Sequence, residues 1–343
     1  MTQTTQTAAD PRAIANRSAG LDALRSFAAL LVVVFHMRTM LVFDFGPLNP
    51  VVEGGNSGVF VFFALSGYLL YKPFVRGDVD LRSYAIKRAA RILPGYFVAL
   101  AALTILTRNP LPVEHPLPYL TITSSYDGPL RAFLGVAWTL SAEVLFYLLL
   151  PLAARLVRDR EILRLSMIAA VSIGLNLIHR IAFNDTNSWL IGSFPLVAYA
   201  FVPGMILAVV EVRHPSVFRR LGGHASLVLG AALVVLGCLQ FADPIAIPTG
   251  VGTVLVMGWL LHHHVPGARA FAFLGGASYA LYLWHRDLLI GFGIPGVLIA
   301  ALGSAASWAI VERPILDWAH RVSAGWRNKP APDAHSVASS AAS

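Results

Sequence analysis

The sequence contains few charged residues and only one cysteine. Charged residues make up 13% of its 343 positions and hydrophobic residues 56%, which leaves too little polar surface to cover a soluble protein of this size. The single cysteine, Cys238, excludes an internal disulfide framework and a cysteine-based metal site. Residues 1–19 lack the apolar core of a cleavable signal peptide. Together these features indicate a polytopic membrane protein.

The hydrophobic residues fall into runs of about 18 to 23 residues, the length of a helix that crosses a bilayer. We therefore expect an all-α transmembrane helical bundle with about ten spans, at residues 21–43, 57–71, 92–107, 132–153, 163–182, 189–210, 224–241, 245–261, 271–290 and 294–311. The expected domain organisation is a disordered cytoplasmic tail at 1–19, a membrane domain at 20–322 and a second disordered cytoplasmic tail at 323–343.

The distribution of lysine and arginine predicts the topology, because short loops rich in these residues stay in the cytoplasm. With a cytoplasmic N-terminus, all of the 26 basic residues fall in cytoplasmic stretches except Arg38, Arg108, Arg131, Arg180 and Arg286. We expect both termini in the cytoplasm and the chain in the plasma or inner membrane. The net charge of +8 then reflects topology and contact with anionic lipid. Nucleic-acid binding is not expected, because the sequence contains no basic surface domain interleaved with aromatic residues.

The first predicted span carries two ionisable residues, Arg25 and His36. Eleven residues are close to three helical turns, so the two side chains share a face about 16 Å apart. Ionisable residues inside a membrane are costly unless they are paired or face a cavity, which makes them candidates for function. The alternative is an arginine that reaches the interface and a histidine bonded to a neighbouring helix. Asp22, just before the apolar run, is predicted to cap the helix.

Two further patterns carry charge into or beside the membrane. Arg88 and Arg91 are neighbours on one helical face at the start of the third span, where a guanidinium pair could grip phosphate or simply anchor the helix. Glu143 lies near the middle of the fourth span, where it would take up a proton or pair with His36, Arg25 or another arginine. The alternative for Glu143 is a structural bond between two helices.

Three other patterns remain open or indicate little chemistry. His285 follows aromatic residues toward the outer end of the ninth span, which fits either a substrate-binding role or an interfacial aromatic belt. Ser66 lacks the flanking glycines of a nucleophile elbow and is predicted to allow close helix packing. The run His262-His263-His264 has no carboxylate nearby, so we predict a chance polar cluster and no metal site.

Taken together, the motifs resemble the acyltransferase 3 family of integral membrane acyltransferases. They occur in the order typical of that family and cover about residues 18–320: Leu21-Asp22-Ala23-Leu24-Arg25 with His36, Phe62-Phe63-Ala64-Leu65-Ser66-Gly67-Tyr68-Leu69, Arg88-Ala89-Ala90-Arg91, Trp138-Thr139-Leu140-Ser141-Ala142-Glu143 with Phe146-Tyr147, and Ser278-Tyr279 through His285.

The resemblance implies a ten-span enzyme that takes an acyl group from cytoplasmic acyl-CoA and places it on a hydroxyl of a glycan, a lipid-linked sugar or a secondary metabolite. Acetyl-CoA is the default donor, with no metal. The resemblance implies that Arg25 and His36 are the essential pair of the first span. It also implies that Arg88 and Arg91 form the arginine motif linked to the acyl donor, and that Glu143 is the acid of the fourth span. The candidates for substrate binding are Trp138, Tyr147 and His285.

These positions suggest a mechanism. A sugar hydroxyl needs a base to attack a thioester, and histidine is the side chain whose ordinary pKa lies nearest to neutral pH. We hypothesise that His36 removes the acceptor proton while Glu143 orients the imidazole, with Arg25, Arg88 and Arg91 binding the donor. The alternative function is a ten-span transporter that uses Arg25, His36 and Glu143 as a substrate or proton site.

Overall fold

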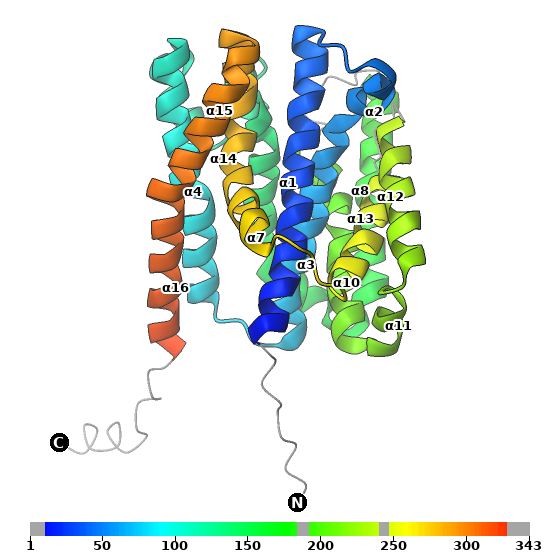
Figure 1. Ribbon diagram of the computed structural model, residues 1–343. Helices are drawn as coiled ribbons and strands as arrows, with labels where there is room; N and C mark the ends of the chain where they lie inside the picture. Colours follow the sequence, from blue (N-terminus) through cyan, green and yellow to red (C-terminus); the bar gives the residue numbers. More distant parts are fainter. Residues whose placement is uncertain (1–10, 184–191, 240–246, 328–343) are drawn as a thin grey trace, which may run out of the picture.

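The computed structural model describes residues 11–183, 192–239 and 247–327, and all regular secondary structure in these ranges is helical. Figure 1 shows a bundle in which the longer helices run roughly parallel or antiparallel to one another. Within the described ranges, five helices are long and apolar enough to cross a membrane, or six if a helix pair bent by 41° counts as one span. The predicted all-α helical bundle is confirmed at this level.

The helices that build the bundle follow one another along the chain in this order: α1 (Pro11–Leu41), α3 (Gly58–Arg76), α4 (Leu81–Thr107), α7 (Trp138–Val157), α8 (Glu161–Phe183), α9 (Phe194–Val197), α10 (Val202–Arg213), α12 (His224–Leu239), α13 (Ile247–Leu260), α14 (Ala268–Phe292), α15 (Ile294–Ser307) and α16 (Arg313–Arg327). A short helix, α2 (Asn49–Glu53), lies between α1 and α3, and another, α11 (Pro215–Arg220), follows α10.

The helical region extends beyond the predicted boundaries at both ends. Helix α1 begins at Pro11 and α16 ends at Arg327, so residues 11–19 and 323–327 are helical, and the rest of both expected tails lies outside the described residues. The prediction that Asp22 caps a helix is therefore wrong, because Asp22 lies inside α1. Its carboxylate instead accepts a hydrogen bond from Arg25 Nη1 at 2.9 Å, one turn further along.

The stretch Gly135–Phe183 is helical over 49 residues and contains α7 and α8, but the two helices pass through the bundle in opposite directions. At 1.5 Å per residue a straight helix of this length would span about 74 Å, more than twice a bilayer core. Trp138 at the start of α7 lines the same cavity as Asn176 and Arg180 near the end of α8, so the chain turns back between them. The turn is the charged 3-10 segment Arg158–Arg160.

Helices α3 and α10 cross at two glycines. A Cβ atom on Gly67 would overlap the carbonyl oxygen of Phe201, and one on Gly204 would overlap that of Ala64. Only glycine permits these backbones to approach so closely. The crossing holds α3 in the centre of the bundle, and α3 carries residues that line all three hollows described below.

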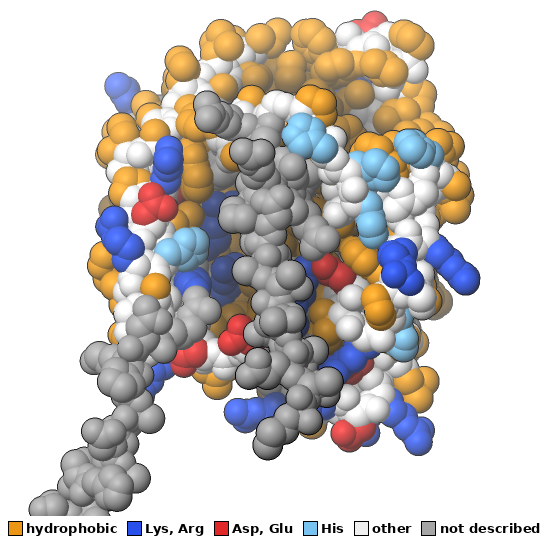
Figure 2. Space-filling view, turned by 60° about the horizontal axis from the view of Figure 1, so that its bottom comes forward, with side chains coloured by type: hydrophobic (Ala, Val, Ile, Leu, Met, Phe, Trp, Pro, Cys, Tyr) orange, Lys and Arg blue, Asp and Glu red, His pale blue; other side chains and the backbone are white. Residues whose placement is uncertain are grey.

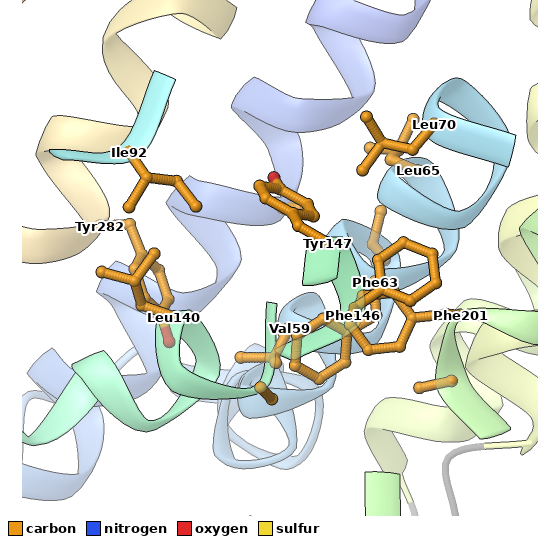
Figure 3. Close-up of a cluster of buried hydrophobic side chains, with 14 of the residues drawn as sticks. Val59, Phe63, Leu65, Leu70, Ile92, Leu140, Phe146, Tyr147, Phe201 and Tyr282 are labelled. Carbon is orange, nitrogen blue, oxygen red and sulfur yellow. The ribbon is translucent and has the colours of Figure 1, made fainter. Parts of the chain in front are cut away.

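The core beside this crossing is aromatic. The ring of Phe201 stacks on Phe63 at a centroid distance of 4.5 Å and on Phe146 at 4.2 Å, which joins α3 and α7 to the start of α10. Figure 3 shows these rings together with Tyr147, while Tyr282 from α14 stands on the other side of the cluster, beside Ile92 and Leu140. This layer fixes the positions of the helices that supply the polar site.

The two ends of the bundle differ in charge. The first turn of α1 and the last turn of α16 lie at the same end, which we call the inner end; the opposite end is the outer end (Figure 1). Figure 2 turns the inner end forward and shows lysine and arginine side chains spread around it, with apolar side chains above. Arg38 and Arg108 stand at the outer ends of α1 and α4. The orientation of the two ends relative to a membrane stays a prediction.

Candidate functional site

A central cavity brings together charged residues from three helices. Arg25 of α1, Arg88 and Arg91 of α4, and Glu143 of α7 all line it, and its volume of about 100 Å³ leaves room for several water-sized groups. Far apart in the sequence, these four residues were all predicted as site residues. The structure shows that one cavity holds three guanidinium groups and one carboxylate.

The arginines of α4 are held mainly by aromatic rings. The Arg88 guanidinium lies 5.8 Å from the ring centroid of Tyr147, and that of Arg91 lies 5.5 Å from Tyr279 and 5.7 Å from Trp308. Such cation–π contacts place a cation without neutralising it. Among the described residues, the buried Nε of Arg88 has no hydrogen-bond partner. The cavity therefore keeps donor capacity for an anionic ligand.

Glu143 does not contact His36, which corrects the expected pairing. Its Oε1 accepts hydrogen bonds from the hydroxyl of Ser66 at 2.7 Å and from that of Tyr147 at 2.5 Å. Tyr147 lies one turn along the same helix, whereas Ser66 comes from α3. The physical reason is position: Glu143 lines the central cavity, while His36 faces a different hollow nearer the outer end.

The imidazole of His36 pairs instead with that of His285 from α14. His36 Nδ1 lies 3.0 Å from His285 Nε2 and 2.9 Å from the carbonyl oxygen of Val32, and His285 Nδ1 lies 3.1 Å from the carbonyl oxygen of Leu281. Helices α1 and α14 pack closely along their length, which brings the two rings together.

The carbonyl partners determine which nitrogen of each ring carries the proton. A carbonyl oxygen only accepts, so His285 Nδ1 donates to Leu281 and His285 Nε2 keeps its lone pair when the ring is neutral. His36 Nδ1 must then donate, shared between Val32 and His285. This leaves the lone pair of His36 on Nε2, the nitrogen that takes no part in these bonds. A neutral His36 therefore has a free lone pair to act as a base.

His285 itself is fully buried and lines neither the central cavity nor the outer cavity. That it binds substrate stays a prediction, and the structure places it behind His36 rather than on a described cavity wall. Its geometry is that of a residue that positions His36. The two other substrate-binding candidates are placed in cavities, Tyr147 in the central cavity and Trp138 in the outer one.

Three hollows follow one another from the inner to the outer end. The inner hollow, of about 760 Å³, is lined by Lys72, Arg76, Lys87 and Arg88, and Arg88 also lines the central cavity. The outer cavity, of about 650 Å³, is lined by His36 and Trp138.

Between the central and outer cavities stand Val59 and Tyr282, which line both. The Tyr282 hydroxyl donates to the carbonyl oxygen of Val136 at 3.2 Å and lies 3.1 Å from the hydroxyl of Thr139, so the backbone of the segment before α7 fixes this partition. A ligand that reached from the arginines to His36 would have to pass between the two side chains.

Sequence reasoning missed three contributors to these cavities. Ser66 was expected only to allow close packing, which holds for its neighbour Gly67, yet Ser66 also bonds to Glu143. Nothing in the sequence marked Val59 or Tyr282 as a partition between two cavities. In the described parts of the chain, no cluster of three or more histidine, cysteine, aspartate or glutamate side chains could hold a metal ion.

Comparison with known proteins gives consistent matches over most of the chain. The family model described as Acyltransferase domain matches residues 18–311. The exopolysaccharide production protein ExoZ of Rhizobium meliloti (strain 1021) is 29% identical, covering 81% of this chain and 95% of that protein. The putative acetyltransferase ORF330 of Acidianus two-tailed virus is 26% identical, and the match covers 85% of this chain and 90% of that protein.

A third relative is longer than this chain. The O-acetyltransferase OatA of Staphylococcus aureus (strain NCTC 8325 / PS 47) is 22% identical, covering 86% of this chain and 57% of that protein. No solved structure matches the chain significantly.

Proposed function

The chain belongs to the acyltransferase 3 family, and from that premise we propose that it moves an acyl group, acetyl by default, from acyl-CoA to a hydroxyl of a carbohydrate or glycosylated metabolite. The observation that carries this proposal is that a cavity lined by arginines and a cavity lined by a histidine base meet at one partition. Guanidinium groups line the central cavity, and a histidine with a free lone pair lines the outer cavity across the partition of Val59 and Tyr282. An anionic donor and a neutral hydroxyl need these two environments.

The donor would enter from the inner end. The nucleotide end of CoA carries several phosphate charges, and the inner hollow has lysine and arginine side chains on its walls. Arg88 belongs to both this hollow and the central cavity, so it would contact the donor where the pantetheine arm begins. Arg25 and Arg91, deeper in the central cavity, would stabilise the negative charge that develops on the thioester oxygen.

The acceptor would enter from the outer end. His36 Nε2 would take the proton of the acceptor hydroxyl as its oxygen attacks the thioester carbon. The carbon–sulfur bond then breaks, and CoA leaves as a thiolate that regains a proton from the His36 imidazolium. A general base of this kind contributes about 10²- to 10⁴-fold in rate. His285 would act as a positioning residue for His36.

Glu143 takes a different role from the one expected from the sequence. Its carboxylate holds the hydroxyls of Ser66 and Tyr147 and supplies one negative charge among the arginines of the central cavity. In this role it would keep Tyr147 beneath the Arg88 guanidinium, where the two form their cation–π contact. Glu143 would therefore affect donor binding more than the acceptor proton.

The orientation in the membrane follows from the same assignment. Among the described residues, five helical segments are long and apolar enough to cross a membrane. In this proposal we count ten passes by taking α7 and α8 separately, α9 with α10 as one broken pass and α15 with α16 as another, and by adding α12, α13 and α14. Ten crossings put both chain ends on one side, and the basic inner end would face the cytoplasm of a cell whose plasma or inner membrane holds the protein. Acyl-CoA would then be available at the end where the arginines lie.

A transporter is the second candidate, because three hollows in series would also suit a path for a solute. The two functions differ in one observable. A transporter moves a solute across liposomes without consuming acyl-CoA, whereas the acyltransferase releases CoA in proportion to the acylated acceptor.

The test is transfer of labelled acetyl from acetyl-CoA to an extract of envelope glycans by detergent-purified protein. We expect acceptor-dependent CoA release that is lost in His36→Ala and kept in His115→Ala, a matched control because His115 is exposed in an outer loop. Size-exclusion profiles would confirm that both variants fold. No transfer from acetyl-CoA or from longer acyl-CoAs by folded wild-type protein would refute the proposal and favour transport.

A further inference from the structure

The outer cavity is strongly basic. Three arginines line it, Arg131 from the segment before α7, Arg180 from α8 and Arg286 from α14, and no aspartate or glutamate is among its described lining residues. Asp287 lies behind the cavity wall: its Oδ1 accepts from the backbone N–H of Leu134 at 3.1 Å and forms an ion pair with Arg286 Nη1 at 3.8 Å. The described residues that line the cavity that His36 faces therefore include basic side chains and no acidic one.

Membrane topology does not account for these arginines, because basic residues are selected for the cytoplasmic side. Of the five arginines predicted on the outer side, three gather in this one cavity. The two others lie apart from it: Arg38 pairs with Glu53 at 2.8 Å, and Arg108 ends α4 in a left-handed conformation. Like charges that cluster beside the proposed base His36 would be stabilised by a bound anionic ligand.

Two of these arginines, Arg131 and Arg286, interact through their charges. Burial, and after it the charge of Arg286, lower the pKa of Arg131. Arg286 Nη1 donates to the carbonyl oxygen of Ala132 at 3.1 Å, and Arg180 Nε donates to Asn176 Oδ1 at 2.8 Å. These bonds to neutral groups fix the direction of both side chains, as suits an anion site.

The same cavity has the size and lining that a sugar requires. Its volume of about 650 Å³ lies within the range of about 300–1,000 Å³ typical of ligand pockets. Trp138 and Tyr199 provide aromatic surface, and the exposed amide of Asn56 provides a donor and an acceptor for hydroxyl groups.

We propose that the acceptor is an anionic carbohydrate, a sugar with a carboxylate or phosphate group that Arg131 and Arg286 bind while a neighbouring hydroxyl meets His36. This inference rests on the proposed function, since it names the acceptor class of the same site. Arginine suits both anions because its planar donors match carboxylate and phosphate oxygens. The anion would fix the register of the sugar so that one hydroxyl, and not its neighbours, lies at Nε2.

The test is equilibrium binding to full-length protein in lipid nanodiscs without acetyl-CoA, measured by calorimetry. The probes are cellobiose, cellobiouronic acid as its carboxylate counterpart, and cellobiose phosphate. We expect at least one anionic probe to bind roughly tenfold or more tightly than cellobiose, the gain of about one charge-assisted contact. Arg131→Gln and Arg286→Gln should abolish that preference, Arg131→Lys should keep part of it, and Arg38→Gln should leave it unchanged.

Several results would overturn the inference. The first is equal binding of the neutral and anionic probes. The second is absence of binding by both anionic probes at 10 mM, roughly the weak limit of specific recognition. The third is a preference for anionic probes that survives Arg131→Gln and Arg286→Gln. The carboxylate and phosphate arms identify the anion. The acetyl-transfer assay is run on the same preparations, so arginine-dependent anion binding without CoA release would refute acyl transfer while leaving the anionic glycan site in place.

Discussion

Replacing His285 should slow the transfer step without weakening donor binding. The His36 Nδ1–H group donates to His285 Nε2 at 3.0 Å and to the carbonyl oxygen of Val32 at 2.9 Å. In His285→Leu only the first of these bonds is lost, so Val32 still fixes the tautomer. The variant therefore keeps the base and loses one of the two contacts that hold its ring.

The size of the effect follows from the charge that His36 gains. A hydrogen bond between neutral groups contributes about 1 kcal/mol, and one from a charged donor about 1.5–3 kcal/mol. The bond to His285 therefore stabilises the imidazolium of the transition state about 0.5–2 kcal/mol more than the neutral ring of the ground state. This difference corresponds to a decrease in kcat of roughly 2- to 30-fold. His36→Ala should lose about 10²- to 10⁴-fold, which is more.

The assay is steady-state acetyl transfer with the KM for acetyl-CoA measured in parallel, since that KM should stay within about twofold of wild type. His285→Gln is the matched variant, because its amide oxygen can accept in place of Nε2 and should restore most of kcat. A kcat for folded His285→Leu within twofold of wild type would refute the positioning role. An equal loss in the Leu and Gln variants would show that His285 acts only through packing.

Three other perturbations test other parts of the structure. Arg88→Gln and Arg91→Gln should each raise the KM for acetyl-CoA roughly tenfold, because each removes a cation from the donor path. The control Arg155→Gln, at the exposed inner end of α7, should leave this KM unchanged. An unchanged KM in the first two variants would show that these arginines do not bind the donor. Val59→Trp should narrow the passage between the central and outer cavities. Acetyl transfer should therefore fall by more than an order of magnitude, while calorimetry shows an unchanged affinity for acetyl-CoA. Normal transfer would mean that the acyl group takes another route. Gly204→Val should prevent folding, seen as loss of the monodisperse size-exclusion peak, because its Cβ would overlap the Ala64 carbonyl; a well-folded variant would contradict the close crossing of α3 and α10.

The sequence predicts the helices well because hydropathy depends on each segment alone. The start of α12 coincides with its expected position at residue 224, and the first span ends two residues before the predicted boundary. Helix ends near charged residues are harder to predict: α1 continues upstream through Asp22 because the carboxylate finds Arg25 one turn later rather than capping a terminus. Local pattern alone cannot distinguish these two uses of an aspartate.

Contacts between helices were predicted less well. Spacing along α1 indicates that Arg25 and His36 share a face, but it does not say which helix lies opposite each residue. The packing of α14 on α1 places His285 within hydrogen-bond distance of His36. The contact of α3 with α7 places Ser66 within hydrogen-bond distance of Glu143. The expected pair of His36 and Glu143 needed information on the arrangement of the helices that a single sequence does not contain.

The partition between the two cavities gives a reason for this arrangement. An activated thioester beside a general base and water would hydrolyse, and a site open to the outer cavity would waste acyl-CoA. Val59 and Tyr282 separate His36 from the arginines of the central cavity, and the hydroxyl of Tyr282 donates to the carbonyl oxygen of Val136, in the segment before α7 that also carries Arg131. An acceptor bound by Arg131 would press on that segment. Transfer across the partition would then depend on an occupied outer cavity, so CoA release without acceptor should stay near the uncatalysed rate.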